Sequence, residues 1–124
     1  MHTRDKTLLV VDDAPDNIQL LSGLLKQSYK IKAATSGEKA LLIARKAPAP
    51  DLILLDVMMP DMDGYEVCTQ LQQDDDTRAI PVVFVTGHAS AEEKQRGLSL
   101  GAAAYLSKPV VRDELFSVIE QLLD

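Results

Sequence analysis

The sequence predicts an α/β protein: a doubly wound, five-stranded parallel sheet with strand order 2-1-3-4-5 and helices on both faces, written (βα)5. Short apolar segments alternate five times with segments of helical periodicity. The most apolar segment, residues 51–56, lacks the polar alternation of a half-exposed strand, so we expect it to be covered on both faces. Right-handed crossovers leave few topologies for five such units, and this order places the first and third strands side by side.

The first two strands are expected at residues 6–11 and 29–34, which are short and rich in apolar residues. The helix after the first strand should begin at Pro15, because the N–H that proline lacks has no partner in the first turn. The helix after the second strand should open with a capping box formed by Thr35 and Glu38.

The last three strands are expected at residues 51–56, 81–86 and 104–107. Capping pairs should open the third and fourth helices: Asp63 with Glu66, and Ser90 with Glu93. The fifth helix is expected at residues 112–123, where apolar side chains recur on one face: Leu115, Ile119 and Leu122.

Length and charge narrow the function classes. The 124 residues fit one domain over residues 1–124, either stand-alone or excised from a longer protein. A net charge of −6 and the absence of tryptophan disfavour direct nucleic-acid binding. We expect neither a signal peptide nor a membrane-inserted segment, because no apolar stretch follows residues 1–6 and the longest apolar runs are too short to span a bilayer. We therefore expect a cytoplasmic protein in which Cys68, the single cysteine, is a small core residue.

Polar side chains follow four of the five predicted strands. Asp12 and Asp13 follow the first, Asp56 ends the third, Thr86 ends the fourth, and Lys108 follows the fifth. The carboxyl ends of parallel strands share one edge of the sheet, where ligands of this fold class bind. Crowded carboxylates resist ionisation unless a cation joins them, and Mg²⁺ suits such oxygen ligands. The pattern predicts a magnesium site with room for phosphate oxygens.

Each of these residues also has a simpler explanation. The carboxylates could cap a helix or a turn, the threonine could make a local hydrogen bond, and the lysine could be a surface charge. The run Asp74–Asp76 is expected to be a solvated loop. Neither a Gly-rich dinucleotide motif, a P-loop nor a serine nucleophile elbow is present. The convergence of all five residues on one edge favours a functional site.

These motifs resemble those of bacterial two-component response-regulator receiver domains, which include chemotaxis regulators and have a flavodoxin-like fold. The resemblance rests on Leu-Val-Val-Asp-Asp at 9–13, on Asp-Leu-Ile-Leu-Leu-Asp-Val-Met-Met-Pro-Asp-Met-Asp-Gly at 51–64, on Val-Phe-Val-Thr at 83–86 and on Tyr-Leu-Ser-Lys-Pro at 105–109. It covers essentially the whole chain, and the five signature positions are filled in order.

The resemblance implies a Mg²⁺-dependent phosphoprotein in which Mn²⁺ can replace Mg²⁺. Asp56 would be the phosphoacceptor, forming an aspartyl phosphate with a phosphoryl group from a kinase histidine. Asp13, Asp56 and the backbone carbonyl of Met58 would bind the metal directly, and Asp12 would bind it through water. Such a domain catalyses only its own phosphorylation and autodephosphorylation, and is otherwise not an enzyme.

The resemblance also assigns residues to catalysis, switching and lifetime. Thr86 and Lys108 would contact phosphoryl oxygens, and the Lys108–Pro109 peptide bond would be cis. Thr86 would move toward the phosphate and admit the ring of Tyr105, which would alter the face formed by the fourth helix, fifth strand and fifth helix. The simpler alternative for Tyr105 is a static ring at the sheet edge. Met58 and His88 would tune the lifetime of the acyl phosphate.

The implied partners are proteins of a phosphorelay: a sensor histidine kinase or phosphotransfer protein, an output domain or downstream effector, and a second copy bound through the fourth helix, fifth strand and fifth helix. Neither nucleic acid nor membrane is expected to bind directly. The alternative function is a phosphorylation-independent docking module on the same fold. A metal-dependent phosphohydrolase is a third reading, but the sequence shows neither the substrate pocket nor the second acid or base that it would need.

Overall fold

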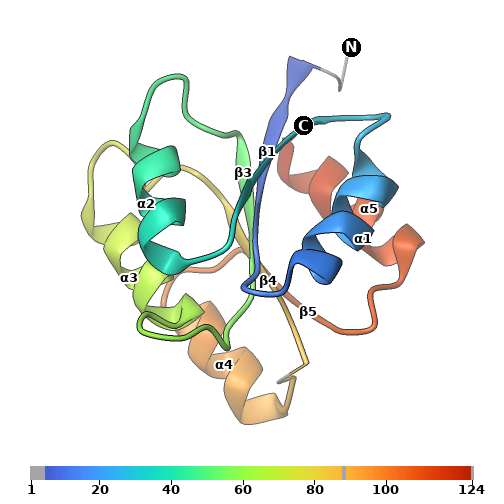
Figure 1. Cartoon of the computed structure of the whole chain (residues 1–124). Helices are drawn as coiled ribbons and strands as arrows, with labels where there is room; N and C mark the ends of the chain where they lie inside the picture. The colour runs from blue at the N-terminus through green and yellow to red at the C-terminus, as the bar shows by residue number, and fades with distance from the viewer. Residues whose placement is uncertain (1–4, 88, 124) are drawn as a thin grey trace.

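Five parallel strands form one sheet in the order β2-β1-β3-β4-β5 in the computed structural model, which describes residues 5–87 and 89–123 (Figure 1). This confirms the predicted fold class and strand order. The strands are β1 (Thr7–Val11), β2 (Lys30–Ala34), β3 (Leu52–Leu55), β4 (Val82–Thr86) and β5 (Ala104–Ser107). The first four begin one residue later than expected, a difference that leaves the strand pairing intact.

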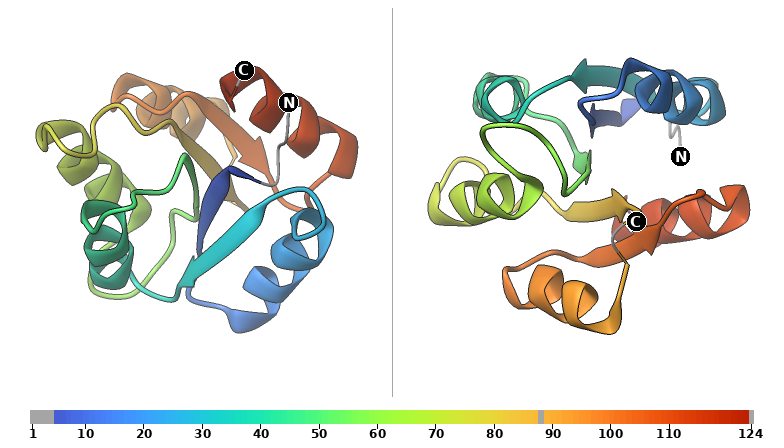
Figure 2. Two further views of the ribbon diagram at one scale, coloured as in Figure 1. Left: turned by 90° about the horizontal axis from the view of Figure 1, so that it is seen from above. Right: turned by 60° about the horizontal axis from the view of Figure 1, so that its bottom comes forward.

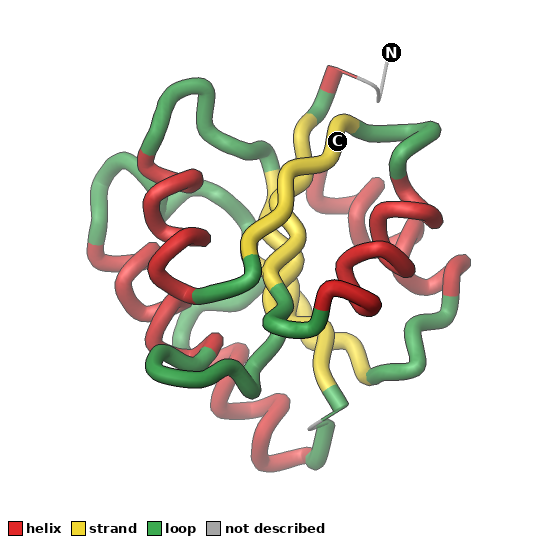
Figure 3. Tube along the Cα trace, viewed as in Figure 1, coloured by secondary structure: helices red, strands yellow, loops and turns green. Residues whose placement is uncertain are grey.

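The helices cover both faces of the sheet, as Figure 2 shows. One face is covered by α1 (Pro15–Leu25) and α5 (Arg112–Leu123), and the other by α2 (Gly37–Arg45), α3 (Gly64–Gln73) and α4 (Ala91–Ser99). In Figure 3 the strands form a central layer between the two groups of helices. Among the described residues, none of these helices has the length and apolar character needed to cross a membrane.

Alternate residues of each central strand enter two separate hydrophobic cores. In β1, Leu9 and Val11 face the α2–α3–α4 side, whereas Leu8 and Val10 face the α1–α5 side. The same alternation holds in β3 and β4, whose residues are all buried. Side chains that point to opposite faces of a sheet need cover on both, which is why these strands are continuously apolar.

The N-terminal caps of α3 and α4 agree with those predicted from the sequence, and that of α2 differs. Asp63 accepts a hydrogen bond from the Glu66 N–H at 2.9 Å, and Ser90 accepts one from the Glu93 N–H at 3.2 Å, as predicted. The prediction for α2 was wrong by one residue. Ser36, not Thr35, is the cap, because its extended backbone lets its hydroxyl accept from the Lys39 N–H at 3.2 Å.

Candidate functional site

The register of the sheet brings the polar residues at the strand ends together. The N–H of Asp56 donates to the carbonyl of Val11 at 3.0 Å, which sets the end of β3 beside the end of β1. The N–H of Lys108 donates to the carbonyl of Thr86 at 2.9 Å, so β4 and β5 end side by side as well. These ends lie at the lower edge of the sheet in Figure 1.

Three carboxylates meet at this edge. Asp12, Asp13 and Asp56 each offer an oxygen within 4.8 Å of the others' oxygens. Asp12 is 2% exposed and Asp56 is 7% exposed, while Asp13 is open to solvent. The site therefore has a buried floor and an accessible side.

The ammonium of Lys108 lies among these carboxylates. Its Nζ is 2.7 Å from Asp12 Oδ2 and 3.4 Å from Asp56 Oδ2, and its side chain is 24% exposed. The reading of Lys108 as a plain surface charge is therefore wrong. One ammonium against three carboxylates leaves an excess of two negative charges when all are ionised, and a divalent cation matches that excess.

Each buried carboxylate divides its two oxygens between the backbone and the site. Asp12 Oδ1 accepts from the Ala14 N–H at 2.9 Å, and Asp56 Oδ1 accepts from the Val57 N–H at 2.8 Å. The second oxygen of each faces Lys108. For Asp56 a local turn bond was the simpler explanation, and it is present. For Asp12 the simpler explanation was a cap of α1, which does not form, because the N-cap is Ala14 and no side chain caps it. The bonds of both aspartates are local turn bonds. They use one oxygen of each carboxylate and hold the other in place.

Burial raises the pKa of the Asp56 carboxyl above its ordinary value. The neighbouring Lys108 opposes this effect and Asp12 adds to it, while hydrogen bonds from the Thr86 side chain and the Val57 N–H favour the ionised form. Nearby positive charge favours the ionised form of this buried carboxylate, and a bound metal ion would add to that charge.

The oxygen ligands fit Mg²⁺, which binds through one or two carboxylates and retains several waters. Asp13 is exposed and Asp56 is buried, and each offers an oxygen within 4.8 Å of the other's. Met58 lies two residues after Asp56 and is 57% exposed. His88, the other residue expected to tune acyl-phosphate lifetime, lies outside the described residues.

A close backbone contact beneath Asp56 was missed by the sequence analysis. The Gly64 N–H donates to the Val57 carbonyl at 2.8 Å, and a Cβ on Gly64 would lie 2.1 Å from the Asp56 carbonyl oxygen. Only glycine permits this approach. The Asp-Gly pair that opens α3 was the available signal, but an N-cap alone explained it.

Tyr105 lies on the edge strand β5, and its side chain is buried. It is 8% exposed, its ring centroid lies 5.4 Å from that of Phe84, and its hydroxyl lies 3.0 Å from that of Tyr65. A Cβ on Gly97 would lie 2.7 Å from the Tyr105 ring. Gly97 thus lets α4 approach this ring, a reason that helical periodicity could not reveal.

Two smaller predictions are confirmed. The Lys108–Pro109 peptide bond is cis. Cys68 is fully buried in the α2–α3–α4 core, where burial raises the pKa of its thiol to about 11, as expected for a structural cysteine.

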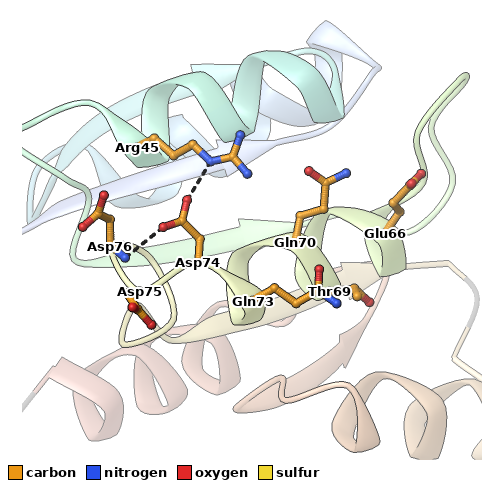
Figure 4. Close-up of a pocket in the computed structure, with 8 residues that line it drawn as sticks. All are labelled: Arg45, Glu66, Thr69, Gln70, Gln73, Asp74, Asp75 and Asp76. Atoms are coloured by element: carbon orange, nitrogen blue, oxygen red, sulfur yellow. Dashed lines mark hydrogen bonds and ion pairs between the residues drawn. The ribbon is translucent and has the colours of Figure 1, made fainter.

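A surface hollow lies away from these residues. Figure 4 shows this groove of about 840 Å³ between α2 and α3, lined by Arg45 and by acidic and amide side chains. Asp74 accepts from the Arg45 side chain at 3.0 Å and from the Asp76 N–H at 2.9 Å. The latter bond is the main cause of the lowered pKa of Asp74. This acidic run shapes a turn, in agreement with its reading as a loop.

Comparison with known proteins agrees with this geometry. The family model described as the response regulator receiver domain matches residues 8–120. A "Probable cyclic di-GMP phosphodiesterase" of Vibrio cholerae is 51% identical over 104 residues, which cover 84% of this chain and 23% of that protein. The chain thus spans less than a quarter of the length of that relative.

Two further matches cover nearly whole chains. Protein PilH of Pseudomonas aeruginosa is 35% identical over 117 residues, covering 94% of this chain and 96% of that protein. The crystal structure of the receiver domain of sensor histidine kinase PA1611 from the same species superposes with a TM-score of 0.86 at 26% identity, covering 95% of this chain and 97% of that one. It contains a magnesium ion coordinated in the active-site cleft.

Proposed function

This chain belongs to the response regulator receiver domain family of two-component systems, and on that premise we propose that Asp56 accepts a phosphoryl group from a kinase histidine. The observation that carries the proposal is the placement of Asp56. It is a nearly buried carboxylate with one oxygen fixed by the backbone and the other directed toward an ammonium, beside two further carboxylates.

The proposed step is a transfer of one phosphoryl group. A carboxylate oxygen of Asp56 attacks phosphorus and forms a P–O bond while the P–N bond of the phosphohistidine breaks. The imidazole leaves with the electron pair and can take a proton from water. The product is an acyl phosphate on Asp56, which water later hydrolyses to restore the carboxylate. In this sense the domain catalyses only reactions of its own side chain.

Lys108 and Thr86 would hold the transferred group. Lys108 is closer to Asp12 than to Asp56, so its longer contact to Asp56 Oδ2 is the one that a phosphoryl oxygen can replace. The Thr86 side chain already hydrogen-bonds the Asp56 carboxylate and would donate to another phosphoryl oxygen. Both groups would oppose negative charge where it develops during transfer.

A divalent metal would be held by the carboxylates of Asp13 and Asp56 and by the carbonyl of Met58, with Asp12 acting through water. When bound, Mg²⁺ or Mn²⁺ neutralises charge on the carboxylates and on the phosphoryl oxygens. The chain's own part is to keep the oxygens of Asp12 and Asp56 in place through the turn bonds described above.

We further propose that the phosphoryl group changes the face formed by α4, β5 and α5, with Thr86 and Tyr105 as the residues that move. The donor would be a histidine kinase or phosphotransfer protein in the cytoplasm, and the receiver of the signal an output domain, an effector or a second copy of this face. Met58 and His88 would set how long the acyl phosphate lasts. The domain would function either alone or as part of a longer regulator.

Intact-mass spectrometry after incubation with acetyl phosphate and Mg²⁺ tests the proposal. We expect a gain of one phosphoryl group that is lost in Asp56→Asn and in the presence of EDTA. Asp75→Asn is the matched control, because its side chain is exposed and lies outside the site. A wild-type chain that gains no phosphoryl group would refute the proposal and favour the phosphorylation-independent docking module.

A further inference from the structure

A hydrogen-bonded row of three side chains connects α3, α4 and β5. The Tyr65 hydroxyl contacts the Glu93 carboxylate, lies 3.3 Å from the Glu93 carbonyl oxygen and lies 3.0 Å from the Tyr105 hydroxyl. Tyr65 is 4% exposed, so most of its side chain is removed from solvent. The row therefore ties the buried ring of Tyr105 to two helices.

The order of donors in this row follows from the number of protons. A carboxylate only accepts, so the single hydroxyl proton of Tyr65 goes to Glu93. The hydroxyl of Tyr105 then donates to the oxygen of Tyr65. Burial and the hydrogen bond to Glu93 raise the pKa of Tyr65, so the phenol keeps this proton. Tyr65 is thus the central member on which both other contacts depend.

The ring of Tyr65 is held independently of its hydroxyl. The ring centroid lies 5.3 Å from that of Phe84, and the guanidinium carbon of Arg96 lies 4.2 Å above the same ring. The ring should therefore stay in place when the hydroxyl is removed, and the hydrogen-bonded row can be tested without emptying the core.

Tyr65 also follows directly on the residue that touches the backbone of Asp56. Gly64 packs against the Asp56 carbonyl and donates its N–H to Val57. A shift of the backbone at Asp56 must therefore move the start of α3, and Tyr65 with it. This connection is separate from the one that passes from Asp56 through the Thr86 side chain.

We propose that Tyr65 is a positioning residue for Tyr105, so that α3 provides a second connection between Asp56 and the α4–β5–α5 face. The proposal rests on the proposed function of Asp56 for its role in signalling. Its structural part, that the Tyr65 hydroxyl and Glu93 hold Tyr105 and α4 in their present arrangement, applies to the unphosphorylated chain.

The first test is hydrogen exchange of the backbone amides of residues 94–100 in the unphosphorylated protein. We expect Tyr65→Phe to speed exchange there by at least about 5- to 10-fold, the factor that the loss of one buried hydrogen bond produces, because this variant removes both the donor to Glu93 and the partner of the Tyr105 hydroxyl. Tyr29→Phe is the matched control, because Tyr29 is equally buried but lies in the opposite core against Phe116. Unchanged exchange in Tyr65→Phe, or an equal effect of Tyr29→Phe, would overturn the proposal.

Glu93 provides a second variant that leaves both rings intact. Glu93→Ala removes the carboxylate acceptor but leaves the Glu93 carbonyl oxygen near the Tyr65 hydroxyl, so it should speed exchange in the same direction as Tyr65→Phe but by a smaller factor. Glu93→Gln keeps a side-chain acceptor oxygen and should restore slow exchange. If Glu93→Ala leaves exchange at residues 94–100 unchanged, Glu93 does not hold the Tyr65 hydroxyl and the proposal fails.

The signalling part is tested by repeating the exchange experiment with the phosphorylated protein. We expect Tyr65→Phe to gain the phosphoryl group in wild-type yield but to show less than half of the wild-type change in exchange at residues 94–100. A full wild-type change would show that the connection through Thr86 is sufficient. Failure of the wild type to gain a phosphoryl group would refute the proposed function alone, because the experiments on the unphosphorylated chain still decide whether Tyr65 positions Tyr105.

Discussion

Replacing Gly64 with alanine tests whether the start of α3 must touch the backbone of Asp56. The added Cβ would lie 2.1 Å from the Asp56 carbonyl oxygen and 3.0 Å from the Val57 Cα. Both neighbours belong to the main chain and cannot rotate away, so α3 or the loop after β3 must move by about 1 Å or more to reach an ordinary contact. We therefore expect the largest loss of stability among the glycine variants.

The magnitude follows from comparison with two other glycines in helices. Gly23 has no atom within 4 Å of an added Cβ, so Gly23→Ala should stabilise the protein by about 0.5–1 kcal/mol through helix propensity alone. At Gly97 the same gain is opposed by contacts of 2.7 and 3.1 Å with the rings of Tyr105 and Phe84. Overpacking costs about 1–3 kcal/mol, so we expect Gly97→Ala to be destabilised by up to about 2 kcal/mol.

For Gly64→Ala the clash is with backbone, and we expect a loss of about 3 kcal/mol or more in the free energy of unfolding, at or above the upper end of the usual cost of overpacking. Urea unfolding followed by far-ultraviolet circular dichroism measures all three variants, and equal m-values would show that only stability changed. A Gly64→Ala protein as stable as the wild type would refute the close approach of α3 to Asp56. A destabilised Gly23→Ala protein would contradict the comparison.

Three further predictions concern charge at the site. Burial raises the pKa of Asp56 in the folded state above the unfolded value of 3.8. In metal-free buffer, the contribution of Asp56 to the free energy of unfolding should therefore be greatest below pH 3.8 and should fall as the pH rises through the raised pKa. Urea unfolding of Asp56→Asn should lack this part of the pH dependence. Lys108→Met leaves Asp12 and Asp56 facing each other without an ammonium, so unfolding at pH 7 should show a loss of about 1–3 kcal/mol, less than for a fully buried pair because the lysine is partly exposed. A gain in stability at pH 7 would contradict this assignment. Mg²⁺ at 100 times its dissociation constant should raise the free energy of unfolding of the wild type by about 2.7 kcal/mol, and that of Asp13→Asn by much less. Thermal unfolding with and without Mg²⁺ measures both gains. An equal gain in the two proteins would exclude Asp13 as a ligand.

The sequence predicted the architecture because its signals were local and agreed with one another. Continuous apolar strands, Pro15 at the start of α1 and the caps of Asp63 and Ser90 each specified one element. The strand order then followed from chain topology, and it placed Asp12 and Asp56 directly after the ends of adjacent strands. Where two neighbouring residues could both cap a helix, as at 35 and 36, backbone conformation decided between them.

The contacts that the sequence did not predict join residues far apart along the chain. Tyr65 meets Glu93 and Tyr105 across 28 and 40 residues, and periodicity explains each of them only as a member of its own element. Gly97 is similar, since its fit against the Tyr105 ring depends on how closely α4 approaches β5. Distances between elements are set by packing, which a single sequence does not specify.

The most direct test of the account is to locate the phosphoryl group. An acyl phosphate formed with acetyl phosphate and Mg²⁺ is reduced by borohydride, which converts an aspartyl phosphate to homoserine, and tandem mass spectrometry of the peptides identifies the residue. We predict conversion at residue 56 in the wild type and in Asp75→Asn. Conversion at residue 12 or 13 instead, or no conversion at all, would contradict the assignment of Asp56 as the phosphoacceptor.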